Sequence, residues 1–206
     1  MVMSVSKLMF KNLIGLATFT LALLLIAPQQ ISAADKADEF IRDVGQRAIS
    51  SLQEAGLSSS EREAQFRKIF KESFDVKLLA RFSLGVYWRR STKSQQQEYV
   101  RLFENFVVKA YATRFSGYSG EKFKVGTIRE LKGGDKLVAS EIILRDGRTV
   151  PVHWRVRNRK GHLIVDVLVE GISMAITQRD EFSSIISQNG GRVDGLLIAL
   201  RNRTQG

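Results

Sequence analysis

The segment Gly171–Ala175, with Ser173 at its centre, is the stretch of this sequence that most resembles a catalytic motif. It follows a predicted strand and precedes a predicted helix, which is where a hydrolase places its nucleophilic serine. In that fold the sheet is parallel and the catalytic histidine follows the serine, whereas both His153 and His162 precede Ser173. The other interpretation is a tight strand-to-helix turn in which the Ser173 hydroxyl caps the helix. A small secreted esterase using Ser173 is therefore an alternative, and a protein with no catalytic residues is preferred.

Metal and nucleotide chemistry find little support in the residue types present. A zinc site needs about four Cys, His or carboxylate ligands, and the chain has two histidines and no cysteine. His153 lies among outward-facing strand residues, which is typical of a solvated surface. The glycine pairs at 133–134 and 190–191 lack the Lys-Ser/Thr sequence of a phosphate-binding loop. We therefore expect no metal ion and no cofactor.

Apolar residues recur at steps of three and four through much of the chain, which is the spacing of amphipathic helices. The predicted helices cover residues 35–55, 60–74, 75–85, 92–115, 172–187 and 193–200. Ser60 and Glu63 have the spacing of a capping box at the start of the second helix. The helix over 92–115 has the strongest pattern and an unusually aromatic face.

After Gly120 the period changes from about 3.6 residues to 2, which indicates strands. The predicted strands cover residues 122–130, 136–144, 149–157 and 163–169, and short turns join them. They form an antiparallel meander, and helices from both ends of the chain pack on it, so the fold class is α+β. Valines and Trp154 point to one face of the third strand, while Arg155 and Arg157 point to the other, which we expect to meet water. Pro151 lacks a backbone N–H, so its strand should be an edge strand or bulged there.

The first 34 residues have the three parts of a secretory signal. Lys7 and Lys11 precede an apolar run over residues 13–27, and Ser32-Ala33-Ala34 follows. The run is shorter than the roughly 20 residues that span a bilayer as a helix. We expect cleavage after Ala34, with an uncleaved anchor as the alternative. Residues 35–206 then form one extracytoplasmic domain with a single hydrophobic core.

The part of the chain that remains after cleavage is strongly basic. It keeps 30 of the 32 basic residues against 21 acidic ones, which gives a formal charge of +9. Because an exported protein meets little nucleic acid, anionic lipid headgroups or acidic protein surfaces are the expected counterparts. Six residues are candidates for steering such docking, with plain solubility as the alternative: Arg89, Arg90, Arg155, Arg157, Arg159 and Lys160.

Several segments together resemble the MlaC-like (toluene-tolerance) family. The string Asp166–Ser173, with its Asp-Val-x-Val-Glu-Gly-x-Ser pattern, is fairly specific to it. The other matching segments are 84–89, 95–106 with 111–112, 177–182 and 190–197, so the resemblance covers nearly all of residues 35–206. The sequence departs from the commoner pattern of the family at His153-Trp154 and at Leu163.

The resemblance implies a periplasmic phospholipid carrier of a Gram-negative envelope. Such a carrier shuttles lipid between an outer-membrane lipoprotein complex and an inner-membrane ABC transporter complex. In that family the acyl chains enter a cavity between sheet and helices, and the headgroup stays near solvent. The segments 173–175 and 177–179 also resemble the branch associated with hopanoid biosynthesis, so a hopanoid-type lipid is an alternative ligand.

Periodicity alone leaves two interpretations of the many large apolar side chains, an ordinary core or an apolar cavity between helices and sheet. With the resemblance, we expect the cavity and assign its walls. The helical wall comprises Phe103, Phe106, Val107, Tyr111 and Phe115. The sheet wall comprises Val150, Val152, Trp154, Val165, Val167 and Val169. The last three follow an unbroken valine face, because the opposite face would place Asp166 and Glu170 against acyl chains at high cost.

Overall fold

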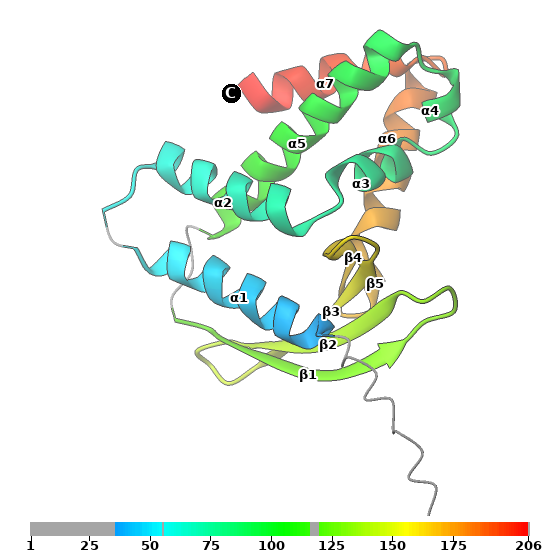
Figure 1. Ribbon diagram of the computed structural model, residues 1–206. Coiled ribbons are helices and arrows are strands. Elements are labelled where there is room, and N and C mark those ends of the chain that lie inside the picture. Colours follow the sequence, from blue (N-terminus) through cyan, green and yellow to red (C-terminus); the bar gives the residue numbers. More distant parts are fainter. Residues whose placement is uncertain (1–35, 55, 116–119, 206) are drawn as a thin grey trace, which may run out of the picture. The chain divides into compact units, whose positions relative to one another are not determined.

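The computed structural model describes residues 36–54, 56–115 and 120–205, so the predicted export signal over residues 1–34 lies outside the described residues. The described part of the chain forms seven helices and a sheet, which confirms the α+β class (Figure 1). None of these helices is long and apolar enough to cross a membrane. The helices are α1 (Ala37–Gln53), α2 (Ser59–Ser73), α3 (Val76–Leu84), α4 (Tyr87–Arg90), α5 (Lys93–Phe115), α6 (Met174–Gln188) and α7 (Val193–Gln205).

The sheet is an antiparallel meander in the order β1-β2-β3-β4-β5, as predicted. The strands are β1 (Lys122–Glu130), β2 (Lys136–Ile143), β3 (Thr149–Asn158), β4 (His162–Val169) and β5 (Ile172–Ser173). The fifth strand has two residues and occupies the place where the sequence predicted the start of a helix. Helices from both ends of the chain contact the sheet, since α1 packs on β1 and β2 and α6 packs on β4 and β5.

Helix α2 begins at a capping box, although not the one predicted. The Ser58 side chain accepts a hydrogen bond from the Glu61 backbone N–H, and the Glu61 carboxylate accepts one from the Ser58 backbone N–H. The prediction of Ser60 with Glu63 is therefore wrong by two residues. The S-x-x-E pattern occurs twice in this segment, and spacing alone does not choose between the two occurrences.

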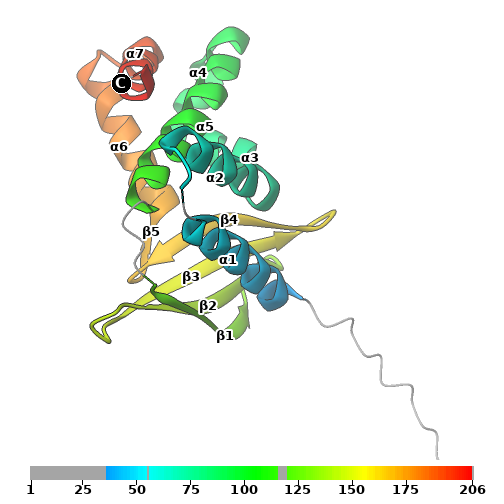
Figure 2. The ribbon, with the colours of Figure 1, turned by 90° about the vertical axis from the view of Figure 1, so that its left-hand side faces the viewer.

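One face of the sheet packs against α1, which lies across it in Figure 2. The buried cluster there is formed by the sheet, α1 and Ile69 of α2, and comprises Ala37, Ile41, Val44, Ile69, Val138, Val156 and Ile164. Trp154 and Val167 are partly buried at its margin. The Trp154 Nε1–H donates to Ser140 Oγ at 2.8 Å, so the indole enters the apolar layer with its polar group satisfied.

A second apolar cluster lies among the helices. It comprises Phe70, Ala80, Leu84, Tyr99, Leu102, Phe103, Val108, Phe182, Ile186, Val193, Leu196, Leu197 and Leu200. Within it, the hydroxyls of Ser83 and Tyr99 share a buried hydrogen bond of 2.8 Å. Phe74 packs against both clusters. The described residues thus have two apolar clusters where the sequence analysis expected a single core.

A β-bulge interrupts the predicted valine face of β4. Arg155 pairs with Asp166, and the next residue of β3, Val156, pairs with Ile164, so Val165 is the extra residue. Because side chains alternate along a strand, this insertion turns Ile164 to the same face as Val156. The unbroken face through Val165 and Val167 is therefore wrong, since Ile164 and not Val165 joins the cluster under α1.

Pro151 lies in an internal strand, because β3 pairs with both β2 and β4. The prediction of an edge strand or a bulge at Pro151 is wrong, since the register shift on the β4 side lies at Arg155 and Val156. The proline is tolerated because β4 pairing ends one residue further along, at Val152 and Val169. The Pro151 carbonyl accepts a hydrogen bond from the Glu170 N–H at 2.9 Å. The proline nitrogen, which has no hydrogen to donate, therefore lies where the pairing of β3 with β4 ends.

Candidate functional site

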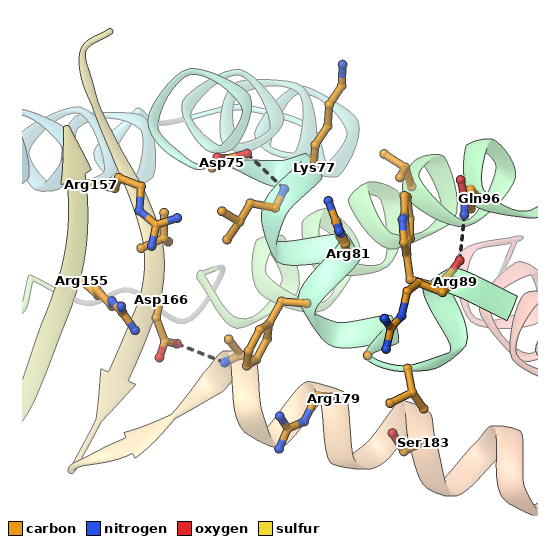
Figure 3. A pocket seen from close by; sticks show the side chains of 18 of the residues that line it. Asp75, Lys77, Arg81, Arg89, Gln96, Arg155, Arg157, Asp166, Arg179 and Ser183 are labelled. Atoms are coloured by element: carbon orange, nitrogen blue, oxygen red, sulfur yellow. Dashed lines mark hydrogen bonds between the residues drawn. The ribbon is translucent and has the colours of Figure 1, made fainter. Parts of the chain in front are cut away.

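A pocket of about 1400 Å³ lies between β3, β4 and helices α3, α4, α5 and α6. Figure 3 shows arginines from the sheet and from the helices converging on it. Its eight basic lining residues are Lys77, Arg81, Arg89, Lys93, Arg155, Arg157, Arg159 and Arg179. The arginine face of β3, which was predicted to meet open water, is therefore one wall of a pocket.

A buried aspartate outside the pocket lining fixes two of these arginines. Asp135, in the β1–β2 turn, has a side chain that is 5% exposed. Its carboxylate accepts from Arg155 Nε at 2.7 Å and from Nε and Nη2 of Arg157, both at 2.8 Å. The hydrogen bond from Arg157 is the main reason that the pKa of Asp135 is lowered, and Arg155 lowers it further. The carboxylate therefore stays ionised and holds both guanidinium groups in place.

The two acidic residues that line the pocket are engaged in local structure. Asp75 caps α3, since its carboxylate accepts the Leu78 backbone N–H at 3.0 Å. Asp166 accepts from the Ser173 hydroxyl at 2.6 Å and from the Ala175 backbone N–H at 3.1 Å. Both carboxylates thus stabilise helix starts.

Most of the basic side chains contributed by the helices and by the β3–β4 turn have no counter-charge of their own. Among the described residues, no ion pair involves Lys77, Arg81, Arg89, Lys93 or Arg159, while Arg179 has a long one to Asp180 at 3.4 Å. Like charges gathered in a concave site reinforce one another and raise the local concentration of anions. The pocket is therefore suited to an anionic ligand.

Apolar side chains complete the lining of this pocket. Leu78, Phe82, Val100 and Val165 lie among the cationic groups. The Arg179 guanidinium carbon lies 5.3 Å from the centre of the Phe82 ring, which holds the cation over an aromatic face. The site therefore offers charge and apolar surface side by side, as an amphiphilic ligand would need.

The structure places ten of the eleven predicted wall residues in two environments, buried and half-buried. Phe103, Val152 and Val165 are buried, and of these Val165 lines the basic pocket. The half-buried residues are Phe106, Val107, Tyr111, Val150, Trp154, Val167 and Val169. Phe106 packs on Phe182 with ring centres 5.7 Å apart. Phe115 ends α5, and its side chain lies outside the described residues. Contact of these residues with a lipid stays a prediction.

Comparison with known proteins places the chain in a family. The family model described as "MlaC protein" matches residues 42–202. The chain belongs to the MlaC family. Toluene tolerance protein ttg2D of Pseudomonas putida is 25% identical over 109 residues, which is 52% of this chain and 51% of that protein. The intermembrane phospholipid transport system binding protein MlaC of Haemophilus influenzae is 21% identical over 123 residues, or 57% of this chain and 56% of the relative.

The fold of this MlaC family member also matches a solved structure. The phospholipid-binding protein from Ralstonia solanacearum, solved in complex with a phospholipid, superposes with a TM-score of 0.74 at 20% identity. The match covers 82% of this chain and 97% of the other. The chain thus spans about half the length of the curated relatives it matches in sequence, and nearly all of the solved structure it matches in fold.

Ser173 has the capping role that the sequence offered as the alternative to catalysis. Its side chain accepts the Ile176 backbone N–H at 3.1 Å and donates to Asp166. His153 and His162 lie on β3 and at the start of β4, and neither makes a hydrogen bond to Ser173 in the described structure. Within the described residues, no group of three or more His, Cys, Asp or Glu side chains is arranged to hold a metal ion.

Sequence reasoning missed half of the basic pocket of this MlaC family member. It singled out Arg89, Arg155, Arg157 and Arg159 as basic surface. The four residues that it missed are Lys77, Arg81, Lys93 and Arg179. The spacing of Lys77 and Arg81 places them on one face of a helix, but no local signal says that this face looks toward the arginines of β3.

Proposed function

We propose that this protein is a periplasmic phospholipid carrier that moves lipid between an outer-membrane lipoprotein complex and an inner-membrane ABC transporter complex. Membership of the MlaC family over residues 42–202 carries this proposal. Two further observations support it. One relative is named as the binding protein of an intermembrane phospholipid transport system, and the solved structure with the same fold holds a phospholipid.

The energy of exposing acyl chains explains why a carrier of this kind is needed. Moving one methylene from water to an apolar site lowers the free energy by about 0.8 kcal/mol. Exposing two ordinary acyl chains to water therefore raises the free energy by an amount on the order of 20 kcal/mol. A carrier must replace the apolar environment of the membrane, and it should receive and release lipid in contact with a partner. The basic surface of the chain would favour docking to anionic membranes or acidic partner surfaces.

We place the acyl chains between the two apolar clusters. A protein with one continuous core would have to unpack to admit a lipid, whereas here the helical cluster and the cluster under α1 are two clusters that Phe74 bridges. On the helical side, Phe106, Val107 and Tyr111 are half-buried. On the sheet side, Val150, Val152, Trp154, Val167 and Val169 would form the opposite wall. Phe103 would support the helical wall from behind, whereas Val165 lines the basic pocket.

Mass spectrometry of the extracted ligand tests the function directly. The protein is purified from cells that express the full chain, extracted with organic solvent, and analysed for lipid per protein. We expect phospholipid in about stoichiometric amount. Recovery of a hopanoid-type lipid would support a lipid carrier whose ligand is not a phospholipid. A folded protein without any lipid would contradict the proposal. Fractionation of the same cells tests the periplasmic location.

A pair of matched variants tests the proposed wall. Val167→Lys places a charge on the half-buried sheet side, and Ile198→Lys places the same charge on α7, where the isoleucine is 53% exposed. We expect the first variant to lose bound lipid because a charge inside an acyl site is costly, and the second to retain it. Circular dichroism checks that both remain folded. Equal lipid content in the two folded variants would reject this wall.

A further inference from the structure

We propose that the basic pocket between β3, β4 and helices α3 to α6 binds the phosphate group of a phospholipid, and that Asp135 positions Arg155 and Arg157 for it. This inference rests on the proposed carrier function and adds a specificity to it. Arg155 and Arg157 leave β3 on the face opposite Val152 and Trp154. The phosphate site therefore lies apart from the proposed acyl walls, although Val165 lines the pocket.

The geometry of the two strand arginines is the first argument. Arg155 and Arg157 lie two residues apart on β3, so their side chains leave the same face of the strand. Asp135 accepts from Nε of both, which fixes the two guanidinium planes, and Figure 3 shows both groups directed into the pocket. Asp135 accepts from Nε of Arg155 and from Nε and Nη2 of Arg157, which leaves both Nη groups of Arg155 and Nη1 of Arg157 to donate to phosphate oxygens.

The charge balance of the pocket is the second argument. Eight basic residues line it against two acidic ones, and both acids already accept hydrogen bonds from helix starts. Asp135 compensates in part for Arg155 and Arg157, and the cations that remain in excess favour a bound anion. Arg81, Arg89 and Arg179 approach from the helical side in Figure 3, opposite the strand arginines. An anion in the pocket would therefore be surrounded.

The size and the apolar part of the lining favour a lipid over an acidic protein segment. The volume of about 1400 Å³ exceeds the usual range of small-molecule sites. Phe82, Val100 and Val165 offer apolar surface within it. A headgroup phosphate with the adjoining glycerol and first methylenes would use both parts. A free phosphate ester would use the cations alone, so the two sources are separable by experiment.

Short-chain lipids that differ only in the phosphate provide the test. Binding of dihexanoyl phosphatidic acid, dihexanoyl glycerol and glycerol 1-phosphate is measured by calorimetry on delipidated protein made from the full chain. We expect the phosphatidic acid to bind more tightly than the diacylglycerol. Glycerol 1-phosphate distinguishes the source, since its binding means that the pocket also accepts a soluble phosphate ester, and its failure to bind means that the phosphate must come with acyl chains.

Two double variants locate the phosphate in the pocket. Arg155→Gln with Arg157→Gln should weaken phosphatidic acid binding about tenfold or more and leave diacylglycerol binding unchanged. Arg129→Gln with Arg148→Gln removes the same charge from exposed positions of the sheet region, and should retain the preference for phosphate. Because losing the strand arginines strips Asp135 of its partners, Arg81→Gln with Arg89→Gln is a second test, as neither residue is paired within the described structure.

The results separate this inference from the carrier function. If both pocket variants fold, bind lipid and keep the wild-type preference for phosphate, the inference is overturned while the carrier stands. If the pocket double variants and the control double variant lose affinity for phosphatidic acid equally, the loss reflects the overall charge of the protein, and the inference also fails. A protein that binds none of the acylated ligands contradicts the proposed function itself.

Discussion

The Ser173 hydroxyl donates a hydrogen bond of 2.6 Å to Asp166 Oδ2. The same hydroxyl oxygen accepts the Ile176 N–H, and Asp166 Oδ1 accepts the backbone N–H groups of Val167 and Ala175. One serine and one aspartate thus connect the end of β4 to the first turn of α6. This connection explains the Asp-to-Ser string of the sequence as a structural device, without a catalytic histidine.

Replacing Ser173 by alanine should destabilise the fold without removing a reaction. Loss of the cap and of the Asp166 partner should lower the free energy of unfolding by about 1–2 kcal/mol. Urea unfolding measures this change, with Ser184→Ala as the control because Ser184 is an exposed serine of the same helix. Hydrolysis of a generic ester by the wild type that disappears in Ser173→Ala would instead support the esterase alternative.

Replacing Asp135 by asparagine should lower stability in a pH-dependent way. The folded-state pKa of Asp135 is lowered from the usual 3.8 by its arginine partners. Its stabilising effect is therefore complete above that value and is lost as pH falls through the lower folded-state pKa. At pH 7 we expect Asp135→Asn to cost about 2 kcal/mol, because it weakens hydrogen bonds to two arginines, and the difference from wild type should shrink below about pH 4.

The matched control for this prediction is Asp146→Asn. Asp146 pairs with Arg148 in the β2–β3 turn through a contact of 2.7 Å, and both side chains are largely exposed. An exposed ion pair contributes little, so this variant should unfold at nearly the wild-type urea concentration. A pH-independent loss in Asp135→Asn would show that packing in the turn, and not the carboxylate charge, is responsible.

Periodicity predicted the elements of this fold because each signal is local. The change of period after Gly120 gave the four long strands, and the aromatic face of residues 92–115 gave α5. Registers between elements are not local. The bulge at Val165 inserts a residue that no alternation pattern marks, and the split into two apolar clusters depends on which helices meet. The pocket could not be predicted from local patterns either, because its basic residues come from four helices and one strand region that are distant in the sequence.

Replacing Gly45 by alanine should destabilise the contact between α1 and β1. Alanine is normally the better helix residue by about 1 kcal/mol, but here a Cβ would overlap the ring of Phe123. Overpacking of this kind usually costs 1–3 kcal/mol, so we expect a net loss of about 1 kcal/mol. Thermal unfolding of Gly45→Ala and of Gly45→Ala with Phe123→Leu decides the cause. Failure of the smaller side chain to recover stability would show that ring overlap is not the reason.

Substitutions at Glu170 should change stability according to how well each residue tolerates a left-handed backbone. Glu170 and Gly171 join β4 to β5 with φ angles of 51° and 83°, the pattern of a type I′ hairpin turn, which favours Asn-Gly. Asparagine adopts this conformation more readily than glutamate does. The Glu170 N–H bond to the Pro151 carbonyl involves only the main chain, so substitution leaves it in place.

We therefore expect Glu170→Asn to raise the free energy of unfolding by about 0.5 kcal/mol and Glu170→Val to lower it by about 1 kcal/mol or more. The side chain is exposed, so the two changes should act through the backbone and not through lost contacts. Urea midpoints of the two variants and the wild type give the comparison. Because α6 begins directly after this hairpin, a destabilised turn should also loosen Arg179 at the pocket. Amide hydrogen exchange across Ser173–Arg179 should then be faster in Glu170→Val than in Glu170→Asn, and equal rates would mean that the turn does not influence the helix start.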